Sequence, residues 1–181
     1  LTYHNTNSLG APGAGKGYLR DVALTTSDIH AISETSWDDA QIKVLTAAMR
    51  TGGHRLWAIA AKTRSTVKSG TAILARSTIS PREGDGLLWG KPDGKALAVA
   101  LTIQEQPVVL LAAHLPHTDR ERVAFLTEVA EEVEKAATAH SQTPEGAPWA
   151  AALYLWAGDL NLTCHRILTN ADGTARPPST R

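Results

Sequence analysis

The sequence predicts an α+β domain in which strands outnumber helices. Short runs of β-branched and aliphatic residues recur along the 181-residue chain, and two of them are joined by only a short turn, which is typical of a β-hairpin. Helical patterns occur between only some of these runs, so the regular strand–helix alternation of a parallel sheet is missing. We therefore expect layers of helix and sheet in a single domain over residues 1–181.

Seven segments have the alternating or continuously apolar pattern of strands. They are residues 1–5, 28–35, 55–60, 70–76, 95–103, 107–115 and 149–160. The fifth and sixth are separated by the turn Gln-Glu-Gln, so we expect them to form the hairpin. The tail after Asn170 has two prolines and no pattern, and we expect it to be irregular.

Three helices are expected among these strands. A weak helical pattern covers residues 18–26, and Asp38 or Asp39 can cap a second helix that runs to about Met49. The third and longest helix opens with the capping-box pattern Thr118-x-x-Glu121. Its expected apolar face consists of Val123, Leu126, Val129 and Val133.

Composition restricts the functional classes only partly. Eighteen basic residues balance eighteen acidic ones, and this neutral total neither indicates nor excludes a local nucleic-acid-binding patch. A single cysteine, Cys164, excludes an internal disulfide bond and fits an intracellular protein, in the nucleus or the cytoplasm. No stretch is apolar enough to predict a membrane span. Because the sequence begins at Leu1 rather than Met, we expect a monomeric domain of a larger polypeptide.

The glycine-rich string GAPGAGKG, residues 10–17, resembles a phosphate-binding P-loop. Gly10 and the pair Gly15–Lys16 match the pattern G-x-x-x-x-G-K-[ST]. However, Gly17 stands where a hydroxyl is needed, Tyr18 follows it, and the preceding strand ends in polar residues that do not suit a buried parallel strand. A nucleotide-binding module is therefore the weaker hypothesis, and a flexible connecting loop is the alternative.

Polar side chains follow four of the predicted strands, whose ends read HNTNS, SET, HLPH and GDLN. These ends contain Asn5, Asn7, Glu34, His114, His117, Asp159 and Asn161. Strand ends can gather at one rim of a sheet, and carboxylate and amide oxygens suit a hard cation such as Mg²⁺. An Asp two residues before an Asn can present both side chains to one phosphate.

Each of these residues also has a purely structural alternative. Glu34 can be a solvated residue at a strand end, and Asn7 belongs to a type common in turns. The Asp and Asn of GDLN can form an Asx turn. The histidines of HLPH can form a structural pair, and although His-x-x-His suggests zinc, no nearby ligand set completes a tetrahedral site.

Five segments, in this order along the chain, resemble the endonuclease/exonuclease/phosphatase superfamily. LTYHNTNSL is similar to its opening strand, Trp-Asn-x-Asn-Gly-Leu, DIHAISET to Asp-Ile-x-x-x-Gln-Glu-Thr, and SGTAILAR to Gly-x-Ala-Ile-Leu. VVLLAAHLPHTDRERVAFLTEV is similar to its strand, His-Leu-Pro turn and long helix, and LWAGDLNL to Gly-Gly-Asp-Phe-Asn. The superfamily includes abasic-site endonucleases, the nicking endonucleases of non-LTR retrotransposons and inositol phosphatases. The resemblance covers residues 1–162.

The resemblance implies a four-layer αββα sandwich with two mixed, mostly antiparallel sheets, incomplete at its C-terminus. It also implies cleavage of a phosphoester bond with Mg²⁺, or Mn²⁺ in its place, and DNA as the partner. Glu34 would bind the metal with Asn5 beside it, and Asn7 would lie nearby at the substrate.

The resemblance assigns the remaining polar residues to the phosphate and the attacking water. Asp159 would orient or activate the water, and Asn161 would hold a phosphate oxygen as charge develops. His114 stands where many members have a phosphate-contacting Tyr or His. His117 stands where many nucleases have an Asn, which implies a substrate-binding role.

The chain departs from the family pattern in ways that bear on activity. His4, Ser8 and Ser33 replace the usual Trp, Gly and Gln, and the terminal Asp and Ser-Asp-His motif of the family do not occur in the sequence. We therefore expect little or no hydrolysis by this chain. The predicted function is the DNA-nicking phosphodiesterase domain of a retroelement-like protein, and an inactive remnant or a phosphatase of the same superfamily is the alternative.

Overall fold

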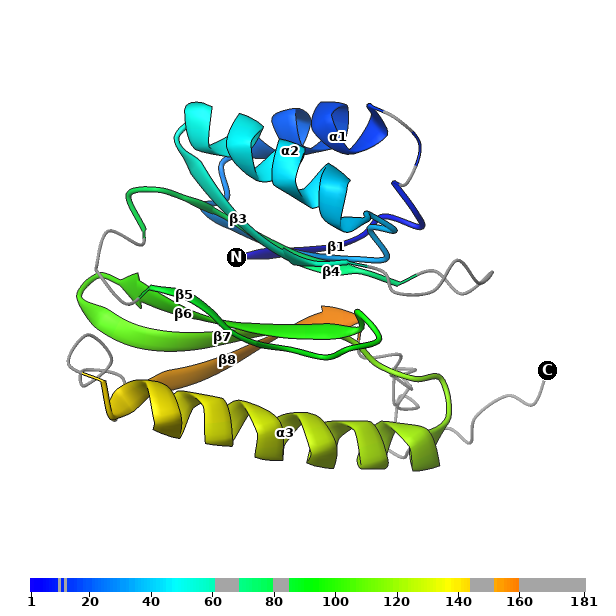
Figure 1. The fold of residues 1–181 in the computed structure, drawn as a ribbon, viewed down its shortest axis with the longest axis vertical. Helices are drawn as coiled ribbons and strands as arrows, with labels where there is room; N and C mark the ends of the chain where they lie inside the picture. The colour runs from blue at the N-terminus through cyan, green and yellow to red at the C-terminus, as the bar shows by residue number, and fades with distance from the viewer. Residues whose placement is uncertain (10, 12, 61–68, 80–84, 144–151, 160–181) are drawn as a thin grey trace, which may run out of the picture.

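The computed structural model has four layers and describes residues 1–9, 11, 13–60, 69–79, 85–143 and 152–159. In Figure 1, helices α1 and α2 cover one sheet, a second sheet packs on the first, and α3 covers the outer face of the second. The helices are α1 (Ala14–Ala23), α2 (Asp39–Thr51) and α3 (Asp119–Ser141). The αββα sandwich implied by the resemblance is confirmed.

The first sheet has four strands in the order β1-β2-β4-β3. They are β1 (Thr2–Asn5), β2 (Ile29–Ser33), β3 (His54–Ile59) and β4 (Thr71–Arg76). β1 pairs with β2 in parallel, whereas the other two pairs are antiparallel. Three of the strands lie within segments that the sequence predicts, and β3 begins one residue before its predicted segment.

The second sheet has the order β5-β6-β7-β8. Its strands are β5 (Gly86–Gly90), β6 (Ala96–Ile103), β7 (Gln106–His114) and β8 (Leu153–Asp159). β6 and β7 form the predicted hairpin, and β7 pairs with β8 in parallel. β5 was not predicted because its sequence, GLLWG, is short, has glycine at both ends and pairs with a shift of register after Leu87.

The helices begin and end close to their predicted signals, with two corrections. Asp38 and Thr118 cap α2 and α3 as expected, each by accepting a bond from the backbone N–H three residues later. α1 begins at Ala14 rather than near Tyr18, because Gly13 takes the N-cap position with a φ of 82° that favours glycine.

The second correction concerns the apolar face of α3. Val123 is exposed, and the buried positions run through Arg122, Phe125, Val129, Val133 and Ala137. At the start of the helix the buried position is therefore Arg122 rather than Val123, and the Arg122 guanidinium is paired with Asp119.

Three apolar layers hold the sandwich together. α1 and α2 pack on the first sheet around Trp37, Leu45 and Ile32, and α3 packs on the second around Val129 and Phe125. Between the sheets lies a third layer, made of Ile29, Ala31, Ile73, Ala75, Leu97, Val99, Leu101, Leu110 and Ala112.

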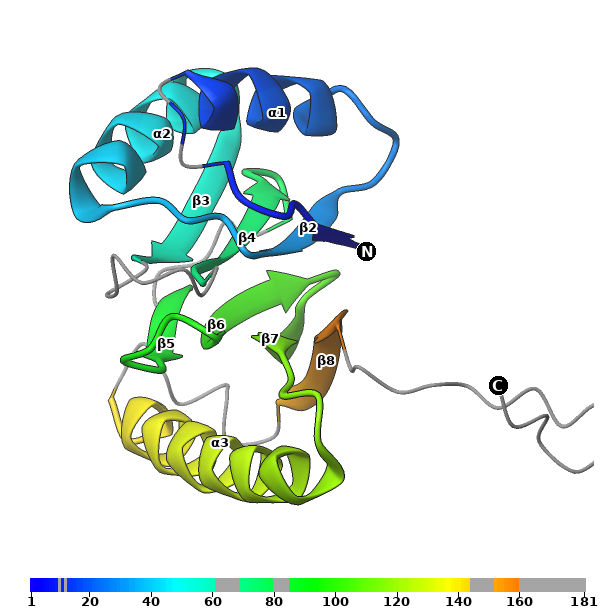
Figure 2. The same ribbon diagram turned by 90° about the vertical axis from the view of Figure 1, so that its right-hand side faces the viewer.

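β1 and β8 are edge strands of their sheets and lie in contact on the same side of the sandwich (Figure 2). β8 exposes Leu153, Tyr154, Leu155 and Trp156, whereas its last three residues are half-buried. None of the described helices combines the length and the apolar character needed to cross a bilayer.

Acidification is expected to lower the free energy of unfolding because His30 on β2 is buried. Burial lowers the pKa of His30 below its ordinary 6.5, the nearby charge of His4 lowers it further, and a bond to the Ser27 carbonyl partly offsets this. The unfolded chain therefore binds more protons than the folded chain just below pH 6.5, and stability falls as the pH falls through that range. Urea unfolding between pH 7.5 and 5.5 measures this slope.

His30→Gln should flatten the slope, and His54→Gln, at a more exposed histidine on β3, is the matched control. An unchanged pH dependence in the His30→Gln variant would show that another group is responsible.

Candidate active site

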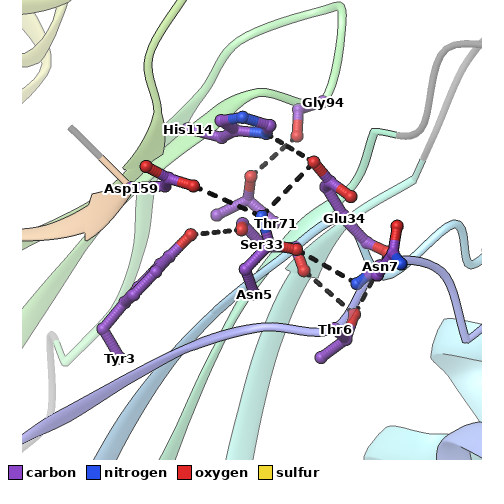
Figure 3. Close-up of polar contacts among 10 residues, drawn as sticks. All are labelled: Tyr3, Asn5, Thr6, Asn7, Ser33, Glu34, Thr71, Gly94, His114 and Asp159. Atoms are coloured by element: carbon purple, nitrogen blue, oxygen red, sulfur yellow. Dashed lines mark hydrogen bonds and ion pairs between the residues drawn. The ribbon is translucent and has the colours of Figure 1, made fainter. Parts of the chain in front are cut away.

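The polar strand ends meet because each sheet has one pair of parallel strands, β1–β2 in the first and β7–β8 in the second. Both pairs lie on the same side of the sandwich. In the first sheet Asn5 pairs in register with Ser33, so Glu34 follows directly at the end of β2. In the second sheet His114 pairs in register with Asp159 at the ends of β7 and β8. Since parallel strands end at the same edge, these residues face one another across the two sheets (Figure 3).

Four of the predicted site residues are within hydrogen-bonding or ion-pair distance of one another. The Asn5 Nδ2 atom lies 3.4 Å from Glu34 Oε1 and 3.4 Å from Asp159 Oδ2, so one amide is shared by two carboxylates from different sheets. The His114 Nδ1 atom lies 3.3 Å from Glu34 Oε1. The side chains of Glu34 and His114 are only 14% and 15% exposed, which shields their interaction from water.

His114 is held in its neutral form near pH 7. Burial lowers its pKa below the ordinary 6.5, and this outweighs the opposing effect of the Glu34 and Asp159 carboxylates. A neutral imidazole that donates Nδ1–H to Glu34 keeps Nε2 as an acceptor. The residue can therefore take up a proton or accept a hydrogen bond at that nitrogen.

The backbone around Glu34 is strained and held by a ladder of loop bonds. Glu34 has a φ of 57°, in the left-handed region that residues other than glycine rarely occupy. The segment after β1 is hydrogen-bonded to the backbone at Glu34. The Thr6 hydroxyl donates to the carbonyl oxygens of Ser33 and Glu34. The Ser8 N–H donates to the Glu34 carbonyl at 2.9 Å. Such strain persists where the surroundings hold it, and it is frequent at functional sites.

Three other predicted residues are less closely tied to this cluster. Asn7 is exposed, and its backbone N–H donates to Asn5 Oδ1 at 3.0 Å. His117 is exposed and lies edge-on to His114, with ring centroids 6.3 Å apart. Asn161 lies outside the described residues, so its predicted contact with phosphate stays a prediction.

The structure adds two residues that the sequence reasoning did not select. The hydroxyl of Tyr3 lies 2.5 Å from the hydroxyl of Ser33, at the inner side of the cluster (Figure 3). A signal was available, because alternate residues of a strand share a face and Tyr3 is two residues before Asn5. Ser33 was noted only as a replacement for the usual Gln.

The potential metal ligands of this cluster are carboxylate and amide oxygens and one imidazole. Within the described ranges no three His, Cys, Asp or Glu side chains are placed to hold a metal together, so no tetrahedral site is formed there. Mg²⁺ commonly binds through one or two carboxylates and retains several waters. Glu34 with Asn5 beside it fits that pattern, and two nearby carboxylates beside a neutral imidazole favour a cation.

The glycine-rich string GAPGAGKG has a structural role that is separate from this cluster. Its second half forms the first turn of α1, where Lys16 is exposed and Gly15 is buried. A methyl group at Gly15 would lie 2.7 Å from Trp37 Nε1, so close packing of α1 on the buried Trp37 requires glycine there. This contact accounts for Gly15 without a bound nucleotide.

No protein-family model and no curated protein match the sequence, but solved structures match the fold. A humanized D. rerio TDP2 carrying 14 mutations is 19% identical with a TM-score of 0.53, covering 97% of this chain and 66% of that one. The mannosyl-6-phosphatase of Bacteroides thetaiotaomicron is 16% identical with a TM-score of 0.54, covering 91% and 66%.

A third match is ANGEL2, described as a 2′,3′-cyclic phosphatase and solved with adenosine-2′,3′-vanadate. It is 15% identical with a TM-score of 0.52, and the match covers 88% of this chain and 46% of ANGEL2. The chain thus spans two thirds or less of the length of these proteins. A further match, with a TM-score of 0.54, is an endonuclease/exonuclease/phosphatase family protein from Bacteroides thetaiotaomicron. The four strand ends and the sandwich that brings them together identify this chain as having the fold of the endonuclease/exonuclease/phosphatase superfamily.

Proposed function

We propose that this chain carries the metal- and phosphate-binding part of a Mg²⁺-dependent phosphodiesterase that nicks DNA, as in retroelement-like nucleases. The observation that carries the proposal is the convergence of Asn5, Glu34, His114 and Asp159 at one rim of this fold. DNA as the substrate rests on the sequence resemblance, and it is supported by a D. rerio TDP2 of the same fold that was solved with a single-stranded DNA product.

Electrostatics explain why the site needs a cation. Glu34 and Asp159 are both acidic, and the imidazole beside them is neutral near pH 7, so the four side chains alone repel a phosphate. Glu34, with Asn5 beside it, would hold Mg²⁺. When bound, the metal would neutralise negative charge on the phosphate and stabilise the leaving oxygen.

The remaining roles belong to protein groups. Asp159 accepts a proton from, or orients, the attacking water, because its carboxylate faces the shared cluster. His114 presents Nε2 toward the phosphate side of the site while Nδ1–H holds Glu34, and His117 and Asn7 contact the substrate from the exposed margin.

A phosphatase is the second candidate, and a specific observation favours it. Two of the proteins with this fold are described as a mannosyl-6-phosphatase and a 2′,3′-cyclic phosphatase, so the sandwich accommodates small phosphoesters as well as nucleic acid. An inactive remnant is the third, motivated by the replaced motif residues Ser8 and Ser33.

Glu34→Gln is expected to weaken divalent-cation binding at least tenfold, because the substitution removes the carboxylate charge and keeps the side-chain shape. Isothermal titration with Mn²⁺ and then Mg²⁺ measures the dissociation constants. Glu105→Gln is the matched control, since Glu105 also has a positive φ, 66°, but lies exposed in the β6–β7 turn. Equal cation affinity in wild type and Glu34→Gln would reject the assignment of Glu34.

Asp159→Asn is expected to reduce Mg²⁺-dependent plasmid nicking about 100-fold, within the range typical of losing a general base. We expect slow nicking by the wild-type chain, so the assay needs long incubation and an EDTA control. Parallel assays with bis(p-nitrophenyl) phosphate and p-nitrophenyl phosphate separate a phosphodiesterase from a phosphatase. A wild-type chain that binds Mg²⁺ and cleaves none of the three substrates would support the inactive remnant.

A further inference from the structure

Tyr3 lies on β1 where it reaches both sheets. It shares a face of the strand with Asn5, because alternate residues point the same way, and its ring packs against the apolar layer between the sheets. Figure 3 shows its hydroxyl pointing to Ser33, on the same side of the cluster as Asp159.

The hydroxyl of Tyr3 has one hydrogen-bond partner in each sheet. It lies 2.5 Å from Ser33 Oγ at the end of β2, and it takes part in a backbone hydrogen bond with Asp159 at the end of β8. Burial raises the pKa of Tyr3 above its ordinary 10, with a smaller contribution from the Asp159 and Glu34 charges, and together they outweigh the lowering by the hydrogen bonds to Ser33 and to the Asp159 backbone. The group is therefore a neutral hydroxyl. The backbone bond from Asp159 lowers the pKa of Tyr3, as only a donor to the phenolic oxygen can, so Tyr3 accepts from Asp159 N–H and can donate its own proton to Ser33.

The bonds of Tyr3 can fix the distance between the Glu34 and Asp159 carboxylates. Pairing within one sheet cannot fix this distance, because the two carboxylates come from different sheets. Glu34 extends from the first sheet and Asp159 from the second, and the layer between the sheets is apolar and therefore not directional. Asn5 and His114 also connect the sheets, but both face the site, where a cation and a phosphate would compete for them. The Tyr3–Ser33 bond is partly buried, and Ser33 itself is fully buried, so this pair is shielded from such competition.

We propose that Tyr3 and Ser33 are positioning residues that brace β8 against β2 and so set the separation of the Glu34 and Asp159 carboxylates. The inference rests on the proposed function of those carboxylates in holding a cation and activating water. It assigns a role to the two side chains beyond the four-residue cluster. Hydrogen-bonded supports of this kind commonly change metal affinity or activity by 10- to 100-fold when they are removed.

Tyr3→Phe tests the proposal because it keeps the ring and removes only the hydroxyl. We expect Mn²⁺ and Mg²⁺ binding to weaken about tenfold by isothermal titration. The matched control is Tyr18→Phe, since Tyr18 is a second partly buried tyrosine whose hydroxyl has no hydrogen-bond partner within the described parts of the chain. That variant should bind cations like the wild type.

Two further measurements separate positioning from general stability. Amide hydrogen exchange at Asp159, followed by NMR without any cation, should be faster in Tyr3→Phe and unchanged in Tyr18→Phe. Ser33→Ala should weaken cation binding in the same direction, and the double variant should lose less than the sum of the two single losses, because both remove the same brace.

The outcomes distinguish this inference from the function on which it rests. Suppose that the wild type binds no divalent cation, but Tyr3→Phe still speeds amide hydrogen exchange at Asp159. The positioning role of Tyr3 is then supported and the proposed function is rejected. If the wild type binds cations and Tyr3→Phe and Ser33→Ala leave both affinity and exchange unchanged, the brace is wrong. If Tyr3→Phe does not fold, Ser33→Ala alone decides between the same results.

Discussion

The site depends on one constraint, the pairing of two parallel strands at the same side of each sheet. β1 beside β2 brings Asn5 and Glu34 to one rim, and β7 beside β8 brings His114 and Asp159 to the facing rim. The sheets then pack through the apolar layer between them, which brings β1 into contact with β8. A shift of either register by one residue would turn Asn5 or Asp159 to the opposite face, because side chains alternate along a strand.

Concentrating acidic groups at this rim opposes folding unless something compensates. Glu34 and Asp159 share one amide, and the adjacent imidazole stays uncharged because burial outweighs the attraction of the carboxylates. Glu34 also occupies a left-handed backbone conformation, held by the Thr6 and Ser8 bonds to β2 and the residue after it. Local conflict of this kind is typical of functional sites, where the rest of the structure maintains an arrangement that short-range preferences disfavour.

The same sandwich explains the most conspicuous string in the sequence through packing. GAPGAGKG connects β1 to α1, and Gly13 and Gly15 serve the start of the helix and its close approach to Trp37. Among the described residues, β8 is the outer strand of its sheet and exposes four neighbouring apolar side chains.

The sequence by itself indicated most of the elements and the four residues that meet in the candidate site. Strand patterns, the caps at Asp38 and Thr118, and the polar ends at Asn5, Glu34, His114 and Asp159 were all readable, because alternation, capping and strand-end polarity are local signals. β5 was missed and Val123 was wrongly placed on the buried face of α3, since a shift of strand register and the burial of Arg122 depend on what each segment packs against. Only the tertiary structure decided that Tyr3 and Ser33 meet beside Asp159. The bond between Tyr3 and Asp159 joins β1 of the first sheet to β8 of the second, and no spacing along the chain encodes the distance between sheets.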